Sequence, residues 1–242
     1  MNDITTITYV LNSGVQHGEN LTSYTVESST IELKDPTKEG YYFAGWFEES
    51  TLSTMKTSIP AGSHDHLTVH AAWNKAYVLQ ETGPEGGTIF YDRIDYDYRT
   101  DDWHYAECGN FDIGDFEWME TAYEEPYINV VGTSESMGTG KENSELILIA
   151  GTLATNRNSA ANACHCYDGA GSGEIWFLPS KDELVKMYEN LMDKGVGHFN
   201  RTSYWSSSQV SLTEAWSIDF SDGSANESNK GNTYVVRPIR RF

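Results

Sequence analysis

Short runs of alternating apolar and polar residues cover residues 4–73, a pattern typical of β-strands separated by turns. Residues 7–11 and 23–26 are rich in β-branched and aromatic side chains, and the aromatic run at 41–47 follows a turn at Gly40. A last strand is expected at 67–73, just before the polar joint at 74–76. We therefore expect an N-terminal domain of strands that covers residues 1–74.

The pattern changes after this joint. A glycine-rich turn at 82–87 leads into a strand, and helical patterns follow around residues 144–153 and 158–166. A third helix has the clearest start, because Ser180 and Glu183 have the spacing of a capping box and Leu184 and Met187 then recur at helical spacing. Strands return from residue 203. Residues 75–242 are thus expected to form a second, α+β domain, which makes the whole chain α+β.

Charge narrows the choice of partners. The chain of 242 residues carries a formal net charge of −20, and twelve acidic residues between Asp92 and Glu125 face only Arg93 and Arg99. Such a segment repels phosphate backbones and anionic lipids, so we expect neither nucleic acid nor a membrane surface as a partner. No apolar run is long enough to span a membrane, and the first residues lack the basic and apolar regions of a signal peptide.

Residues 202–242 combine aromatic side chains with nine Ser and three Asn on an alternating strand pattern. Rigid aromatics beside adaptable Ser and Asn are typical of recognition surfaces. Along residues 216–221 the apolar and polar side chains alternate, so the two sets are expected on opposite faces of a strand, and Asp222-Gly223 predicts a tight hairpin turn. The alternative is a solvated sheet face without a partner. We expect a framework of Trp205, Trp216, Ile218 and Phe220, and ligand-binding residues at Gln209, Ser217, Asp219, Ser221, Asn226, Glu227, Asn229 and Asn232.

The N-terminal segment contains four motifs of one known module: Gly40-Tyr41-x-Phe43-x-Gly45-Trp46, Lys34-Asp35-Pro36-Thr37, Ile59-Pro60-Ala61-Gly62 and Ala71-Ala72-Trp73. On these motifs it resembles the Listeria-Bacteroides repeat, a small β-grasp-like module of bacterial surface proteins. This resemblance implies a stalk or spacer that carries other domains on a cell surface.

The rest of the chain contains a series of motifs in a fixed order: Thr82-Gly83-Pro84-x-Gly86-Gly87-x-Ile89-Phe90-Tyr91, Gly138-Thr139-Gly140-Lys141, Trp176-Phe177-Leu178-Pro179-Ser180-Lys181-Asp182-Glu183-Leu184, Tyr204-Trp205-Ser206-Ser207-Ser208, Phe220-Ser221-Asp222-Gly223 and Val236-Arg237-Pro238. On these motifs it resembles the bacterial domain family known from the C-terminal domain of a Legionella collagen-like adhesin. That family is similar to the C-type-lectin-like fold shared with formylglycine-generating enzymes and with variable proteins of diversity-generating retroelements. The resemblance implies a C-type-lectin-like domain whose last strands carry the ligand surface, in a protein at the cell surface or outside the cell.

Three groups of residues raise the question of a metal or a phosphate. His64, His66 and His70 have a spacing that could suit zinc, but their loop is loose and a fourth ligand is absent. The second group is acidic and consists of Asp95, Asp97, Asp101 and Asp102. These residues could supply oxygen ligands but do not have the spacing of a calcium-binding loop. Glu125-Pro126 only superficially resembles a lectin calcium motif. The glycine-rich run at 138–141 lacks the spacing of a phosphate loop and is expected to be a turn. We expect no metal and no cofactor.

Cysteine chemistry is equally sparse. Cys108, Cys164 and Cys166 allow one disulfide at most, and Cys164 and Cys166 would point to different faces of a helix. Cys164 lies on an apolar stripe and is expected to be a buried small side chain. Formylglycine-generating enzymes need a cysteine pair near their C-terminal end, and no cysteine follows Cys166 in this chain.

Catalytic motifs such as Gly-x-Ser-x-Gly and His-Glu-x-x-His are absent from the sequence. We therefore expect no enzyme but an adhesin-like surface or secreted protein, in which the C-terminal strands bind a protein or glycan. The resemblance to variable proteins leaves open whether these strands are a diversified segment or belong to an ordinary adhesin-like domain. Two alternatives stay open: a hydrolase acting on surface polymers, suggested by the many carboxylates, and a purely structural spacer.

Overall fold

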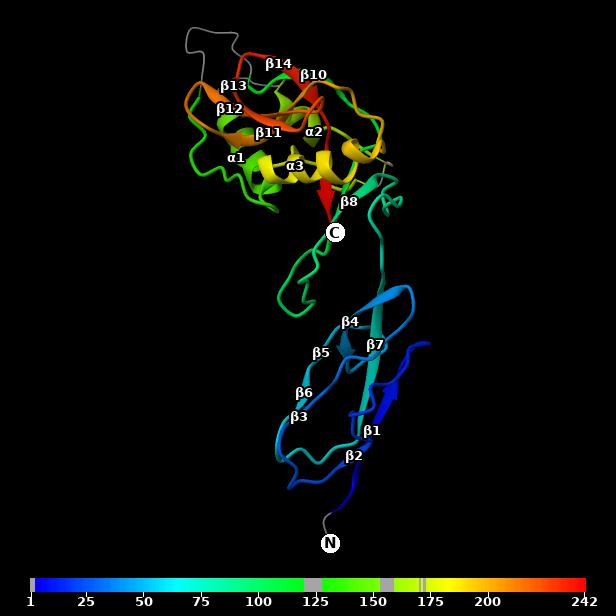
Figure 1. The fold of residues 1–242 in the computed structure, drawn as a ribbon. Coiled ribbons are helices and arrows are strands. Elements are labelled where there is room, and N and C mark those ends of the chain that lie inside the picture. The colour runs from blue at the N-terminus through cyan, green and yellow to red at the C-terminus, as the bar shows by residue number, and fades with distance from the viewer. Residues whose placement is uncertain (1–2, 120–127, 153–158, 170, 172) are drawn as a thin grey trace. The chain divides into compact units, whose positions relative to one another are not determined.

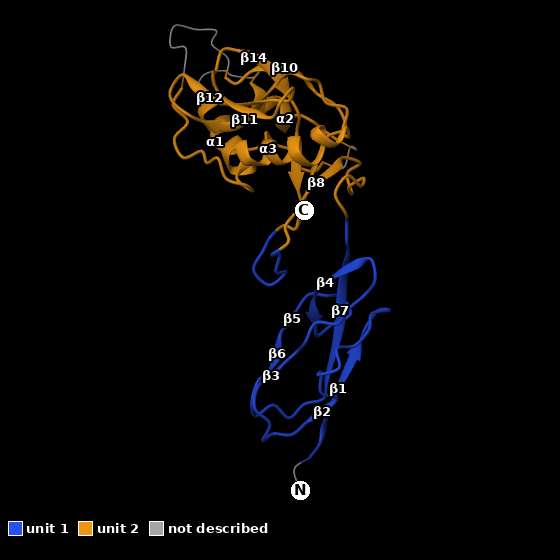
Figure 2. Cartoon of the chain, in the orientation of Figure 1, with its two compact units in different colours: residues 1–77, 95–102 blue, residues 78–94, 103–242 orange. Residues whose placement is uncertain are grey.

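The computed structural model describes residues 3–119, 128–152, 159–169, 171 and 173–242 (Figure 1). Two compact units make up the chain, as Figure 2 shows: unit 1 comprises residues 1–77 and 95–102, and unit 2 comprises residues 78–94 and 103–242. Strands predominate, and the described helices all lie in unit 2. This composition fits the expected α+β class.

Unit 1 is built on a five-stranded sheet in the order β2, β1, β7, β4, β5. Its strands are β1 (Thr5–Val10), β2 (Ser23–Tyr24), β4 (Tyr41–Phe47), β5 (Met55–Lys56) and β7 (Leu67–Lys75), and a separate pair is formed by β3 (Ile31–Glu32) and β6 (Ser58–Ile59). β1 runs parallel to β7, whereas β4 is antiparallel to it. The expected strands of the N-terminal segment are thus present, and residues 3–77 contain no helix.

Trp46 lies at the centre of the core of unit 1. Its side chain is 1% exposed, and its indole N–H donates to the carbonyl of Lys34 at 3.2 Å. The β4–β7 register shifts between Phe43 and Gly45, and Gly45 has φ of 124°, a value that residues with a Cβ rarely adopt. This bulge allows Phe43 and Trp46 to face the same core, where their rings meet edge to face at 5.3 Å. The Gly-Trp part of the sequence motif therefore has a local structural reason.

Residues 95–102 belong to unit 1, although the sequence pattern assigned them to the second domain. The ring of Tyr98 packs edge to face on Phe43 at 5.3 Å, and its hydroxyl donates to Asp35 Oδ1 at 3.2 Å. Arg99 forms an ion pair with the same carboxylate at 2.7 Å. These contacts join residues far apart in the sequence, so no local pattern could reveal them.

Unit 2 contains a five-stranded sheet in the order β10, β14, β11, β12, β13 and a three-stranded sheet in the order β15, β9, β8. Its strands are β8 (Thr88–Asp92), β9 (Tyr105–Cys108), β10 (Gly114–Glu117), β11 (Ser203–Gln209), β12 (Glu214–Asp219), β13 (Ser224–Asn229), β14 (Thr233–Val236) and β15 (Ile239–Arg241). Its helices are α1 (Gly140–Thr152), α2 (Ala160–His165), α3 (Lys181–Asn190) and the 3-10 turn η1 (Met192–Lys194).

Apolar side chains cover both faces of the larger sheet of unit 2. Neighbouring residues of a strand point to opposite faces, and the neighbours Tyr204 and Trp205 belong to two different apolar clusters. The cluster of Tyr204 includes Leu184 and Met187 of α3, whereas that of Trp205 includes residues of α1 and α2. The larger sheet is therefore a central layer, and a polar side chain on either face does not necessarily reach water.

The helix predicted from the capping box is confirmed. Ser180 Oγ accepts the backbone N–H of Glu183 at 3.3 Å, and Glu183 Oε2 accepts that of Ser180 at 2.7 Å. Leu184 and Met187 are buried as expected. The other two expected helices are also present, but α1 begins earlier, at Gly140, so the glycine-rich run at 138–141 is a turn into this helix. Residues 153 and 158, at their expected ends, lie outside the described part of the chain.

Candidate ligand-binding surface

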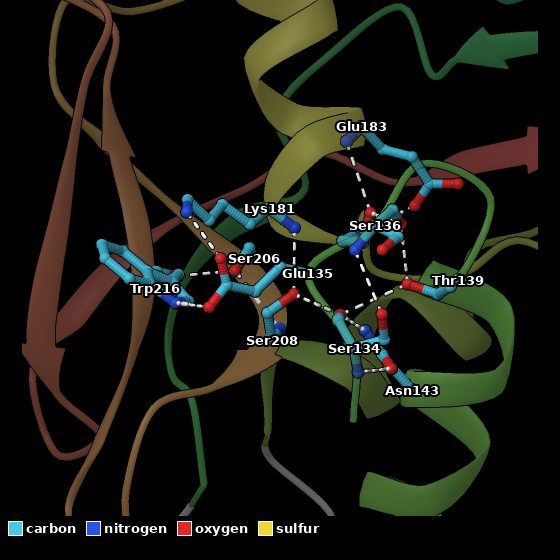
Figure 3. A network of polar contacts seen from close by, with 11 residues as sticks. Ser134, Glu135, Ser136, Thr139, Asn143, Lys181, Glu183, Ser206, Ser208 and Trp216 are labelled. Carbon is cyan, nitrogen blue, oxygen red and sulfur yellow. Dashed lines mark hydrogen bonds and ion pairs between the residues drawn. The ribbon is translucent and has the colours of Figure 1, made fainter. Parts of the chain in front are cut away.

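The three consecutive serines of β11 are internal connectors and do not face solvent. Ser206, Ser207 and Ser208 are each 0% exposed. Ser206 Oγ donates to the carbonyl of Trp216 at 2.8 Å, and Ser208 Oγ donates to that of Ser134 at 2.8 Å (Figure 3). Ser208 Oγ also accepts the backbone N–H of Lys181 at 3.0 Å. These hydroxyls join β11 to β12, to the loop before α1 and to the start of α3.

Asn143 and Glu183 extend this polar network. Asn143 Nδ2 donates to Ser207 Oγ at 3.2 Å and to the carbonyl of Ser134 at 2.7 Å. Glu183 Oε2 accepts the backbone N–H of Gly140 at 3.1 Å in addition to its capping contact. Burial raises the pKa of Glu183 from 4.5 to about 7, because water no longer solvates the charged carboxylate.

Trp216, expected to be framework, is partly exposed and held in one orientation by Glu135 and Lys181. The indole N–H donates to Glu135 Oε1 at 2.8 Å, and the other oxygen of this carboxylate accepts from Lys181 Nζ at 2.6 Å. Lys181 Nζ also lies 4.1 Å from the centre of the indole ring. The hydrogen bond from Lys181 is the main reason that the pKa of Glu135 falls below its ordinary value. The three side chains come from separate elements, as Figure 3 shows, and no sequence signal links them.

β12 and β13 form the hairpin expected around Asp222-Gly223, and Gly223 has φ of 82°. The expected row of solvent-facing polar residues on β12 is wrong for Ser217, whose side chain is 0% exposed. Ser217 pairs with Trp205 on β11, so its side chain lies on the covered face of the sheet. There its hydroxyl lies 2.9 Å from that of Ser228 on β13. Asp219 Oδ1 accepts the backbone N–H of Ser221 at 2.8 Å and so supports the turn. Of the predicted residues Ser217, Asp219 and Ser221, Ser221 is the exposed one.

β13 carries exposed members of the predicted site. Asn226, Glu227 and Asn229 are all exposed, and Glu227 pairs across the ladder with Trp216. Asn226 Nδ2 donates to the carbonyl of Ser224 at 3.2 Å, and Asn229 Oδ1 accepts the backbone N–H of Gly231 at 3.0 Å. The exposed part of the hairpin is therefore ordered and polar.

The amide of Gln209 is occupied inside the protein, which does not fit the expected ligand contact. Its Oε1 accepts from the backbone N–H of Val130 at 2.9 Å and from Lys230 Nζ at 2.5 Å, and its Nε2 donates to Asn129 Oδ1 at 2.7 Å. Asn232 is exposed, and its Nδ2 donates to the hydroxyl of Tyr234 at 3.1 Å. Gln209 is an internal brace because it reaches the loop at 128–130.

Lys230 is fully buried at the turn between β13 and β14. Besides Gln209, its ammonium donates to the carbonyl of Leu212 at 3.0 Å and to that of Ile128 at 3.3 Å. The indole ring of Trp118 lies 4.6 Å away. Burial lowers the pKa of Lys230 from 10.5 to about 8.

The eight predicted residues do not form one contiguous site. Asp219 and Ser221 lie at the turn end of the β12–β13 ladder, whereas Asn229 lies at its other end and Asn232 in the following turn. The exposed predicted residues of the ladder are Asn226, Glu227 and Asn229, and partly exposed Trp216 joins them. Glu227 and Asn229 lie on the face of Trp216, whereas Asn226 lies on the other face, opposite Ser217. This set, Trp216, Asn226, Glu227 and Asn229, is called the hairpin surface below.

The residues considered for metals lie apart or have other partners. Nδ1 of His66 accepts the backbone N–H of Thr6 at 3.0 Å, and Asp97 forms an ion pair with Arg99 at 3.2 Å. Within the described part of the chain, no cluster of three or more His, Cys, Asp or Glu is arranged to hold a metal ion. Glu125-Pro126 lies outside that part.

The three thiols are free. Cys164 is buried as expected, and burial raises its pKa well above the ordinary value; burial likewise raises the pKa of Cys108 to about 12. Cys166 is exposed. None of the helices in the described residues has both the length and the apolar character needed to cross a bilayer.

The chain is similar to a known domain family over part of unit 1 and to a solved structure over nearly its whole length. The chain is similar to the solved structure of a fimbrial protein from Bacteroides ovatus ATCC 8483, with 13% sequence identity and a TM-score of 0.45 over 99% of this chain and 70% of that chain. None of the curated proteins matches the chain. Residues 6–72 match the Listeria-Bacteroides repeat domain, which confirms the resemblance expected from the Gly40–Trp46 motif and its neighbours.

Proposed function

We propose that this chain is part of an adhesin-like bacterial surface or secreted protein, in which unit 1 is a spacer and unit 2 binds a protein or glycan. The match of residues 6–72 to the Listeria-Bacteroides repeat supports the spacer role. The proposal assigns binding to the hairpin surface and includes no catalytic step.

The observation that carries this proposal is the combination of exposure and order on the hairpin surface. Trp216 is held by Glu135 and Lys181, so little conformational entropy is lost when its ring meets a ligand. Glu227 and Asn229 add adaptable polar groups on the same face, and Asn226 adds one on the other face of this edge strand. A fixed aromatic beside adaptable polar side chains is an arrangement suited to recognition.

We also propose, on the motifs of the sequence, that unit 1 is β-grasp-like, that unit 2 is C-type-lectin-like and that the C-terminal segment is diversified. The exposed residues of β13 support the last of these, since they can vary without disturbing the core. A reverse-transcriptase gene beside a template repeat that matches residues 202–242 would support diversification, and a gene neighbourhood without them would overturn it.

Binding can be tested with the full chain on glycan arrays and on immobilised extracellular-matrix proteins. We expect the triple variant Asn226→Ala/Glu227→Ala/Asn229→Ala to bind the captured ligand at least about tenfold more weakly. Lys186→Ala/Glu189→Ala is the matched control, because these residues form an exposed ion pair on α3. Equal capture by the triple variant with its circular dichroism spectrum unchanged would refute the assignment to the hairpin surface.

A further inference from the structure

β13 is the open edge of the larger sheet of unit 2. The sheet order places β12 on one side of it, and in the described part of the chain no strand pairs with its other side. All six residues pair with β12 in one continuous register, from Ser224 opposite Asp219 to Asn229 opposite Glu214. The edge is therefore a regular strand without a bulge.

The ladder determines which backbone groups face the open side. The backbone N–H of Lys230 donates to the carbonyl of Thr213 at 2.9 Å. Lys230 and Thr213 are therefore a hydrogen-bonded pair, and they directly follow Asn229 and Glu214, the last pair of the ladder. Antiparallel pairs alternate between bonded and non-bonded, so Ser224, Asn226 and Ser228 bond to β12. The N–H and C=O groups of Ala225 and Glu227 then point away from β12, toward the open edge.

This edge carries few of the devices that usually prevent pairing. Natural edge strands are protected by charged side chains, above all lysine, by proline, by bulges or by a covering segment. Glu227 is the charged residue of β13. Residues 224–229 contain neither lysine nor proline, and all of their side chains except that of Ser228 are exposed. The opposite edge strand, β10, differs: it is four residues long, and its last residue, Glu117, bridges to Ser159. β13 is thus the edge available to an incoming strand.

The charge of the hairpin indicates what kind of strand fits. Residues 214–229 hold the carboxylates of Glu214, Asp219, Asp222 and Glu227 and no lysine or arginine. Glu227 is exposed and lies next to the outward-facing backbone of Ala225. An added strand with alternating basic side chains would place them beside carboxylates, whereas an acidic strand would be repelled.

We propose that β13 binds an extended, basic segment of a protein partner, which joins the sheet as a further strand through the backbone of Ala225 and Glu227. This inference rests on the proposed function and narrows its ligand from a protein or glycan to an exposed peptide segment. Backbone hydrogen bonds supply affinity in such additions, and the side chains supply selectivity.

The deciding variant is Ala225→Pro in the full chain. Proline removes the outward N–H of residue 225 but no hydrogen bond to β12, and edge strands tolerate proline. Ala225→Val is the matched control, because it keeps the N–H and favours a strand. The probe is a fluorescent ten-residue peptide of alternating Lys and Thr, compared with one of alternating Glu and Thr, and binding is followed by anisotropy.

We expect the Lys-Thr peptide to bind wild-type protein and Ala225→Val alike, and Ala225→Pro at least about tenfold more weakly. The Glu-Thr peptide should not bind. Charge alone attracts a basic peptide to a chain of net charge −20, so hydrogen exchange supplies a second readout. The backbone amides of Ala225 and Glu227 should exchange more slowly in the complex. Equal affinity for Ala225→Pro, or unchanged exchange at both amides, would overturn the proposal.

Two further outcomes separate this inference from alternatives. A dimer of the protein that Ala225→Pro abolishes, without peptide binding, would replace the basic segment by a second copy of the chain and so overturn the proposal. A captured ligand that the triple variant loses but Ala225→Pro retains would also overturn strand addition, while leaving the proposed function intact. Loss in both variants, with retention in Ala225→Val, supports both proposals.

Discussion

β11 and β13 are two strands of one sheet with similar compositions and opposite surroundings. β11 holds four serines and β13 holds two serines and two asparagines, so composition alone gives both the character of a recognition surface. Yet the middle serines of β11 are buried, whereas most of β13 is exposed. The difference follows from position in the sheet: β11 has a strand on each side and apolar clusters on both faces, while β13 is an edge. A serine-rich strand can therefore be an internal connector or a displayed surface.

The strongest test of this comparison replaces serines of β11 and serines of the β12–β13 hairpin by alanine. Ser206→Ala/Ser208→Ala should lower the free energy of unfolding by about 2–5 kcal/mol, because it removes the hydroxyl donor from the carbonyl of Trp216 and the acceptor from the N–H of Lys181 in the interior. The carbonyl of Ser134 loses the bond from Ser208 but keeps that from Asn143. The exposed pair Ser221→Ala/Ser224→Ala should cost less than about 0.5 kcal/mol per site. Urea denaturation of both variants measures the contrast. Similar losses for the two pairs would mean that the strands do not differ as described.

The two regions should also differ in how their stability depends on pH. The network around β11 contains the buried carboxyl of Glu183, whereas the hairpin surface contains no buried carboxyl. The pKa of Glu183 is about 7 in the folded protein against 4.5 for an ordinary glutamate, so the folded state holds a proton that the unfolded chain releases between these values. Its contribution to stability is therefore complete below pH 4.5 and is lost as the pH rises through about 7, a total of about 3 kcal/mol.

The measurement compares wild type with Glu183→Gln by urea denaturation from about pH 4 to about pH 8. Glutamine keeps an oxygen for the N–H groups of Ser180 and Gly140 but cannot titrate. The difference in unfolding free energy between the two proteins should change across this range in favour of the variant at high pH. A constant difference would show that Glu183 has an ordinary pKa in the folded protein.

Trp216 on β12 lies between the two strands. Its carbonyl accepts the hydroxyl of Ser206 on β11, and it is paired with Glu227 on β13. Glu135→Gln keeps an acceptor for the indole N–H but removes the ion pair with Lys181. We expect a loss of roughly 0.5–1 kcal/mol in stability, since Glu135 is about half exposed. The indole N–H resonance of Trp216 should shift in the NMR spectrum; an unchanged resonance would show that the ion pair does not orient the ring.

The smallest effect on stability is expected on the edge itself. Asn226→Ala/Glu227→Ala/Asn229→Ala should change the free energy of unfolding by less than about 0.5 kcal/mol per site, because these side chains are exposed. A loss of several kcal/mol would show that β13 has a structural role like that of β11. Thermal unfolding followed by circular dichroism is sufficient to distinguish these results.

Features set by neighbouring residues could be predicted from the sequence. Ser180 and Glu183 define the start of α3, and Asp222-Gly223 defines the hairpin turn, since both signals act over a few residues. The role of Ser217 could not be predicted, because alternation shows which residues share a face and not whether that face is covered. The internal role of Gln209, predicted as a ligand contact, could not be predicted for a related reason: its partner Lys230 lies in a separate turn, and the loop at 128–130 follows no pattern.

The closed position of Lys230 has a consequence for chemical labelling. Its amine is held by three oxygen atoms and has no exposed surface, so an acylating reagent cannot reach it while unit 2 is intact. Once the turn opens, water solvates the amine and the cause of its lowered pKa is gone, so it reacts like an ordinary exposed lysine. The rate at which an acyl group accumulates on Lys230, set against the exposed Lys186, thus reports how often the turn after β13 opens.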